Sequence, residues 1–320
     1  MPVTQEQRSR LKAMTRSSYD LQALRIQSGL RLCANFRSKL GQVAGESEED
    51  LEEGAKKIID QLRDSFRLLT DGIAKNRLLP KKEGFVGDEI ISDYTELMLV
   101  SQYLELQRVE RQQFGQLEAA LEDFPIWHEF FKPTRGIGPA MAAVIISEVD
   151  VAKAKYVSSL WAFAGLDVAP DGRGRSRKKE HLVRRKYIDK DGVEQERDSI
   201  TYSPTLKTKL MGVVAPSFLR SGSDWREHYD NYKHRIETDP AREKWSDKRA
   251  KEITAAGGNP AVLLWRPGRI HQASLRFMVK EYLKALYCAW RPLEGLEVYP
   301  SYQEAKQGHF HGDDRVKMSS

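Results

Sequence analysis

The chain has 320 residues, of which 40% are hydrophobic, and 52 Lys and Arg against 46 Asp and Glu leave a formal net charge of +6. This apolar content suffices for packed cores and excludes a wholly disordered chain. No apolar run approaches the ~20 residues that a membrane-spanning helix needs, and the first residues lack the apolar core of a secretion signal. We therefore expect a cytoplasmic protein without a membrane partner.

Residues 1–88 are predicted to form an N-terminal helical region. Residues 4–40 contain no Pro and one Gly, and a break follows at 41–46. Beyond it, apolar residues recur at steps of three and four, which is typical of one stripe on an amphipathic helix. The stripe consists of Leu51, Ala55, Ile58, Leu62, Phe66 and Leu69. A helical bundle or a coiled coil is the expected structure of this region.

A second, larger helical domain is predicted over residues 89–300, followed by a polar tail at 301–320. It begins with a long helix at 93–121, on which Leu97, Val100 and Leu104 share one face. Long amphipathic helices often pair with one another. We therefore expect a homo-oligomer that associates through this helix.

A tight Gly-x-Gly turn between two helical segments indicates a helix–hairpin–helix. Glycines permit the sharp turn and a close approach of backbone to a ligand. The N–H groups at the start of the following helix suit one phosphate of a nucleic-acid backbone. The expected DNA contacts at this turn are Arg135, Gly136, Ile137, Gly138, Pro139 and Ala140.

A basic segment at 171–186 follows the turn and accounts for the whole charge surplus, with eight Lys or Arg and two acids. It opens a polar insertion at 171–202, in which Asp191-Gly192 favours a β-hairpin. Clustered cations next to a phosphate-type turn predict a groove for nucleic-acid backbone. The expected DNA contacts are Arg173, Arg175, Arg177, Lys178, Lys179, Arg184, Arg185 and Lys186. Helices are predicted again from Pro204 to Trp290, with a charged loop over 238–260.

These motifs together resemble the C-terminal domain of the transposases of insertion sequences 110, 116 and 902. That family has a Pro-Gly-Ile-Gly-Pro turn with an Ala-rich helix, then a segment ending Ala-Gly-Leu, then a basic stretch with Ser and Gly. The corresponding residues here are 136–139, 163–166 and 175–178, and the resemblance covers roughly residues 95–295.

The resemblance implies DNA binding in transposition or recombination, guided by a structured RNA. In the family, an N-terminal RNase-H-like domain binds Mg²⁺ through acids, and a serine of the C-terminal domain attacks the phosphodiester. Ser176, between two arginines, is the nearest equivalent of that serine, and Ser199, Thr201 and Ser203 are the alternatives under a shifted alignment. Residues 1–90 show no pattern of an RNase-H-like domain. The sequence itself shows no cofactor, and Mg²⁺ enters only if the protein is catalytically active.

Three functions are consistent with these features. The first is a mainly helical DNA-binding protein of a transposon or related mobile element. The second is an active recombinase with Ser176 as nucleophile. The third is a non-catalytic helical scaffold that binds RNA or an acidic partner through its basic loop.

Overall fold

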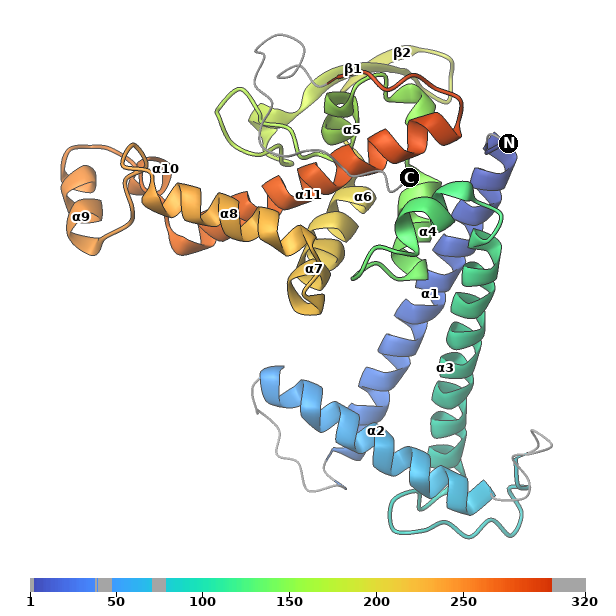
Figure 1. The fold of residues 1–320 in the computed structure, drawn as a ribbon. Coiled ribbons are helices and arrows are strands. Elements are labelled where there is room, and N and C mark those ends of the chain that lie inside the picture. The colour runs from blue at the N-terminus through green and yellow to red at the C-terminus, as the bar shows by residue number, and fades with distance from the viewer. Residues whose placement is uncertain (1–2, 38, 40–47, 71–78, 301–320) are drawn as a thin grey trace. The chain divides into compact units, whose positions relative to one another are not determined.

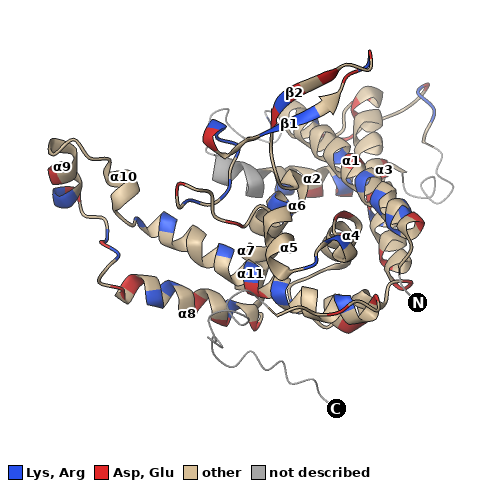
Figure 2. Cartoon of the chain, turned by 90° about the horizontal axis from the view of Figure 1, so that it is seen from above, with Lys and Arg blue, Asp and Glu red and all other residues tan. Residues whose placement is uncertain are grey.

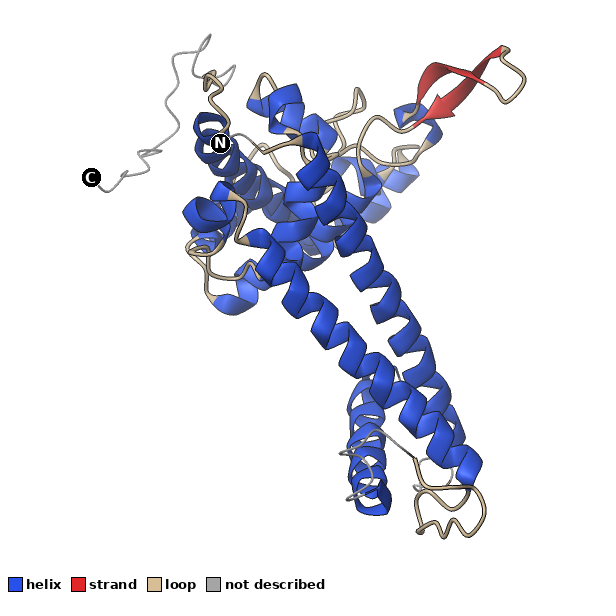
Figure 3. Ribbon diagram, turned by 90° about the vertical axis from the view of Figure 1, so that its right-hand side faces the viewer, coloured by secondary structure: helices blue, strands red, loops and turns tan. Residues whose placement is uncertain are grey.

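The computed structural model describes residues 3–37, 39, 48–70 and 79–300 (Figure 1). These residues are mainly helical, and the sheet they contain is a single antiparallel pair of strands (Figure 3). The predicted mainly-α fold with a small β-hairpin is thereby confirmed. The break predicted at 41–46 and the tail at 301–320 lie outside the described residues.

The described chain divides into two compact units. One comprises residues 13–119, and the other combines the residues up to Lys12 with those from Ala120 onward. This division differs from the boundary expected at residue 88, because the first part of the 94–121 helix, from Tyr94 to Leu104, shares a core with the helices that precede it. All the DNA-contacting residues expected from the sequence lie in the second unit.

The unit at 13–119 is built from three helices, α1 (Gln5–Phe36), α2 (Glu48–Thr70) and α3 (Tyr94–Leu121). Its core contains Phe36 of α1, Ile58 and Leu62 of α2, and Leu97 and Val100 of α3. The part of the predicted stripe from Ala55 to Leu69 thus faces the other two helices. An ion pair between Arg25 and Glu110 also joins α1 to α3.

The apolar face predicted to pair α3 with a second copy packs largely within the same chain. Leu97 and Val100 are buried against α1 and α2, and Leu104 is half-buried. Met98 and Leu99 on the same helix stay exposed. Association through α3 stays a prediction, and it would have to use these remaining side chains.

The second unit is organised around the long C-terminal helix α11 (Pro267–Leu293). Met278, Tyr282, Leu283 and Leu286 of α11 are fully buried. Helices before it in the chain pack on its faces, α8 and α5 most extensively. The elements that precede α11 are η2 (Trp127–Phe131), α4 (Pro139–Glu148), η3 (Val151–Lys153), α5 (Val157–Phe163), η4 (Lys179–His181), β1 (Val183–Ile188), β2 (Glu194–Ser199), α6 (Pro204–Lys209), η5 (Leu210–Val214), α7 (Ala215–Ser221), α8 (Trp225–Thr238), α9 (Asp247–Ala255) and α10 (Pro260–Leu263).

The charged stretch at 238–260, expected to be a loop, contains a helix. Ser246 caps α9 by accepting a hydrogen bond from the Arg249 N–H. Ala250 and Ile253 bury one face of α9 against Leu264. The expectation was wrong because a nine-residue helix with two apolar anchors gives too weak a periodic signal among so many charges.

None of the helices in the described ranges combines the length with the apolar character that a membrane crossing requires.

Candidate nucleic-acid interface and serine site

The Gly136-Ile137-Gly138 turn connects the short π-helix η2 to α4, as the predicted helix–hairpin–helix requires. Gly136 has a φ of +96°, which side-chain-bearing residues rarely adopt. A Cβ at this position would lie 2.7 Å from Ser221 Oγ. The Ser217 hydroxyl donates a hydrogen bond to the Gly136 carbonyl at 2.7 Å. Gly136 is therefore committed to packing against α7 and does not face a ligand.

Little of the turn remains available to a phosphate. Ile137 is buried, whereas Arg135 and Gly138 are exposed. Pro139 has no N–H, and the N–H groups of Met141 and Ala142 donate to the Gly138 carbonyl. Of the six contacts expected here, Arg135 and the Ala140 N–H at the start of α4 are best placed to meet a backbone phosphate.

The first part of the basic segment folds back on the residues that follow α5. The Ala169 N–H donates to the Arg173 carbonyl at 2.7 Å, and the Arg175 N–H donates to the Asp167 carbonyl at 3.1 Å. The Arg175 guanidinium also donates to Asp167 Oδ2, at 2.7 Å from Nη2 and 3.0 Å from Nε. These contacts fix the position of residues 173–175, and the charge of Arg175 is paired with that of Asp167.

Ser176, the predicted nucleophile, lies in a chain of hydrogen bonds with a histidine and an aspartate. Ser176 Oγ is 2.8 Å from His181 Nδ1, and His181 Nε2 is 3.1 Å from Asp171 Oδ2. His181 is only 2% exposed. The one-turn helix η4 brings His181 back to Ser176 over five residues. Neither Ser199 nor Ser203 has such a partner: Ser199 ends β2, and Ser203 caps α6.

The hydrogen bonds of His181 favour one tautomer of its ring. The Ser176 N–H donates to His181 Nδ1 at 3.0 Å, so this nitrogen carries the lone pair and Nε2–H donates to Asp171. Hydrogen bonds from the Arg173 N–H and from His181 lower the pKa of Asp171 and keep it ionised. In this tautomer Nδ1 can accept the Ser176 hydroxyl proton, which is the arrangement that activates a serine.

Two cations from other helices contact the backbone beside Ser176. Lys207 of α6 donates a hydrogen bond to the Arg175 carbonyl. The Arg276 guanidinium of α11 lies against Gly174, where a Cβ would overlap it. The glycine at 174 is thus required by the close approach of an arginine rather than by its own backbone conformation.

Beyond the loop, the predicted contacts divide into two kinds. Arg177, Lys178 and Lys179 are exposed around Ser176. On the hairpin, Arg184 pairs with Glu196 at 3.1 Å and Lys186 with Glu194 at 3.0 Å. Figure 2 shows both signs of charge on the two strands. Residues 171–202 together carry ten basic and seven acidic residues, so the turn and the returning strand together offset half of the charge surplus of 171–186.

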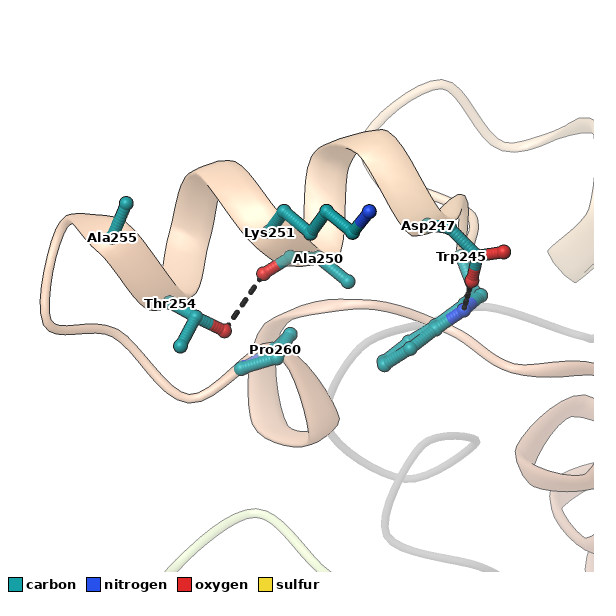
Figure 4. Close-up of a pocket in the computed structure, with 7 residues that line it drawn as sticks. All are labelled: Trp245, Asp247, Ala250, Lys251, Thr254, Ala255 and Pro260. Carbon is teal, nitrogen blue, oxygen red and sulfur yellow. Dashed lines mark hydrogen bonds between the residues drawn. The ribbon is translucent and has the colours of Figure 1, made fainter.

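A pocket elsewhere in the same unit contains none of the predicted residues. It lies between α9 and α10 and is lined by Trp245, Asp247, Ala250, Lys251, Thr254, Ala255 and Pro260 (Figure 4). Its polar groups are mostly engaged: Trp245 Nε1 donates to Asp247 at 3.2 Å, and the Thr254 hydroxyl donates to the Ala250 carbonyl at 2.8 Å. This pocket therefore offers little chemistry compared with the Ser176 site.

The sequence did not predict Asp171, His181, Lys207 or Arg276 as residues of the site. His181 could have been found from its position five residues after Ser176 in a polar segment. Lys207 and Arg276 carried no local signal, because they reach the site only through the packing of α6 and α11. Within the described ranges, no group of three His, Cys, Asp or Glu side chains is placed to hold a metal ion.

No protein-family model, curated protein or solved structure matches this chain. The likeness to insertion-sequence transposases therefore stays a hypothesis that depends on the motifs at 136–139, 163–166 and 175–178.

Proposed function

We propose that this protein binds the phosphate backbone of DNA and acts in transposition or recombination of a mobile element. The observation that carries the proposal is the folded basic loop, which holds three exposed cations, Arg177, Lys178 and Lys179, around Ser176. Such contacts recognise backbone rather than sequence and position the duplex. Arg135 adds a further exposed cation in the same unit. A cytoplasmic location of the protein is part of the same proposal.

The salt dependence of DNA affinity tests this proposal. In the triple variant Arg177→Ala, Lys178→Ala, Lys179→Ala, loss of three phosphate contacts should reduce the slope of log K against log salt by about 3 and weaken binding about 100-fold at 0.15 M salt. Replacement of Lys56, Lys57 and Lys82 by Ala removes the same charge from exposed positions in the other unit. Equal affinities for the two variants would contradict the proposal.

The hydrogen bonds of Ser176 favour a second candidate function, that of a DNA strand transferase. In this reaction Ser176 Oγ forms a bond to a backbone phosphorus while its proton passes to His181 Nδ1. The bond from phosphorus to one sugar oxygen breaks, and that oxygen leaves with a proton from water. The protein then holds one DNA end as a phosphoserine ester until the freed or a new hydroxyl displaces the serine.

Trapping the covalent intermediate tests the second candidate. Supercoiled DNA should yield a protein–DNA adduct that survives denaturation and disappears in Ser176→Ala. Ser199→Ala and Ser203→Ala, which replace the two alternative serines, should retain it. An adduct that persists in Ser176→Ala would assign the nucleophile elsewhere. The family resemblance also implies Mg²⁺, so the assay should be run with Mg²⁺ and with chelator.

The binding experiment also tests the scaffold alternative. Binding to structured RNA or to an acidic peptide, with no affinity for duplex DNA, would favour that alternative. The basic loop would then serve as a docking surface, and Ser176 and His181 would only brace it.

A further inference from the structure

Four cations, from the basic loop, α6 and α11, form a cluster near Ser176 that the sequence did not indicate. We call Arg175, Lys207, Arg276 and Lys280 the cation cluster. Arg276 lies against Gly174, and Lys207 donates to the Arg175 carbonyl, so both reach the backbone within two residues of Ser176. Lys280 lies one helical turn after Arg276 on α11, with its ammonium 4.7 Å from the centre of the Trp161 ring.

The carboxylates facing this cluster are fewer than its cations. Asp167 faces all four cations, and its Oδ2 accepts from Arg175, while Asp171 also faces Arg175 and Glu281 also faces Lys280. Its Oδ1 is buried, and no described residue hydrogen-bonds to it. Arg276 Nε is likewise buried without a hydrogen-bond partner among the described residues. The four cations therefore outnumber the three described carboxylates that face them.

This arrangement costs the folded protein free energy. Burial lowers the pKa of Arg276, Lys207 and Lys280, and for both lysines the nearby Arg276 lowers the pKa further. Lys207, Arg276 and Lys280 are half-buried, and a half-buried cation without full hydrogen bonding still loses part of its hydration. The aromatic rings of Tyr202 and Trp161, each 4.7 Å from a lysine ammonium, stabilise only part of this charge. An anion with several acceptor oxygens would supply what is missing.

We propose that the cation cluster binds one phosphate group of a bound nucleic-acid strand, next to the phosphate that the exposed cations contact. The guanidinium of Arg276 presents a planar set of donors that matches phosphate oxygens, and Lys207 and Lys280 add point charges. A phosphate held there lies beside the backbone of 174–176 and so within the reach of Ser176. This assignment of the strand as ligand rests on the proposed DNA binding, whereas the affinity of the cluster for phosphate does not.

Inorganic phosphate is the first probe. Millimolar phosphate, compared with chloride at equal ionic strength, should raise the melting temperature of the full chain by several degrees. Arg276→Met should abolish this shift, and its melting temperature without phosphate should be unchanged or higher, because a half-buried cation whose Nε has no hydrogen-bond partner among the described residues is gone. Arg226→Met removes the same charge from the exposed face of α8 and should retain the shift. A phosphate shift that persists in Arg276→Met overturns the proposal.

A second arm separates the two sources of phosphate and guards against a misfolded variant. Arg276→Met should also weaken binding of a short DNA duplex about tenfold, because one phosphate contact and its buried setting are lost. Gly174→Ala, which displaces the Arg276 guanidinium without removing it, should weaken the binding of both inorganic phosphate and DNA. DNA binding that is unaffected by Arg276→Met overturns the assignment to the strand. A rise in melting temperature with phosphate in a chain that binds no DNA would make the cluster a site for free phosphate. This result would contradict the proposed DNA binding but not the affinity of the cluster for phosphate.

Discussion

Ser176, His181 and Asp171 form a short relay inside a loop whose neighbours are cations. The relay runs through Nδ1 toward the serine and through Nε2 toward the aspartate. His181 matters as much as Ser176, since a serine hydroxyl is a weak nucleophile until a base takes its proton. The role of His181 as a base can therefore be tested in a protein that keeps Ser176.

We expect His181→Ala to slow formation of the covalent DNA adduct by 10²- to 10⁴-fold, the usual contribution of a general base. Equilibrium DNA affinity should change little, because His181 is buried and contributes no contact. Adduct yield over time and binding isotherms measure the two effects separately. His128→Ala, an exposed histidine of the same unit, is the control. Loss of affinity and of adduct together would indicate that His181 only maintains the loop.

Asp88 gives the helical unit at 13–119 a defined sensitivity to acid. Burial alone would raise the pKa of Asp88, but hydrogen bonds from the Ser65 hydroxyl and the N–H groups of Ile91 and Ile90 together lower it. A carboxylate whose pKa is lowered by folding stabilises the fold above its ordinary pKa, and this contribution disappears as the pH falls through the lowered value.

Asp88→Ala should therefore reduce the free energy of unfolding at pH 7 by about 1 kcal/mol. The difference from the parent protein should shrink as the pH falls below about 4, where the carboxylate of the unfolded chain takes up a proton, and disappear as the pH passes the lowered pKa of the folded state. Urea unfolding at several pH values measures this difference. A gap that is constant over that range would mean that the charge of Asp88 is not what stabilises the loop.

The turn before α4 combines two glycines with opposite tolerance. Gly136→Ala should lower stability by about 1–3 kcal/mol, because φ is +96° and the new methyl would meet Ser221. Gly138→Ala should be nearly neutral, since φ is −97° and nothing lies within 4 Å of its Cβ position. Thermal unfolding of the pair provides its own control. Equal losses would show that the turn does not hold the described conformation.

Much of the fold could be predicted from local sequence patterns. Where the prediction failed, the failure has a physical reason. The stripe at 51–69 and the helix at 93–121 have strong periodicity, and Asp191-Gly192 specifies a turn by itself. The helix α9 is short and mostly charged, so its periodicity is faint. For the site, Ser176 and its cations lie in one segment that composition reveals. Arg276 joins them from a hundred residues away through packing that no local pattern encodes.

The division into two units separates binding from a large part of the hydrophobic core. All the proposed DNA contacts and the relay lie beyond residue 120, whereas Leu62 is fully buried in the core of 13–119. Leu62→Ala should destabilise that core by about 2–5 kcal/mol and leave DNA affinity at 20 °C within twofold. Leu283→Ala, at a fully buried position of α11, should reduce both stability and affinity. Circular dichroism and binding isotherms report the two quantities, and an equal loss of affinity would couple the units.

The β1–β2 hairpin offers a practical handle on the molecule. Every residue of β1 is exposed, as is β2 up to Asp198, so neither face of this ribbon is covered by a helix. Its tip at 189–193 therefore resembles the loop tips at which proteins accept inserted sequence. A fluorophore or an affinity tag placed there would report on the neighbouring basic loop without entering either core.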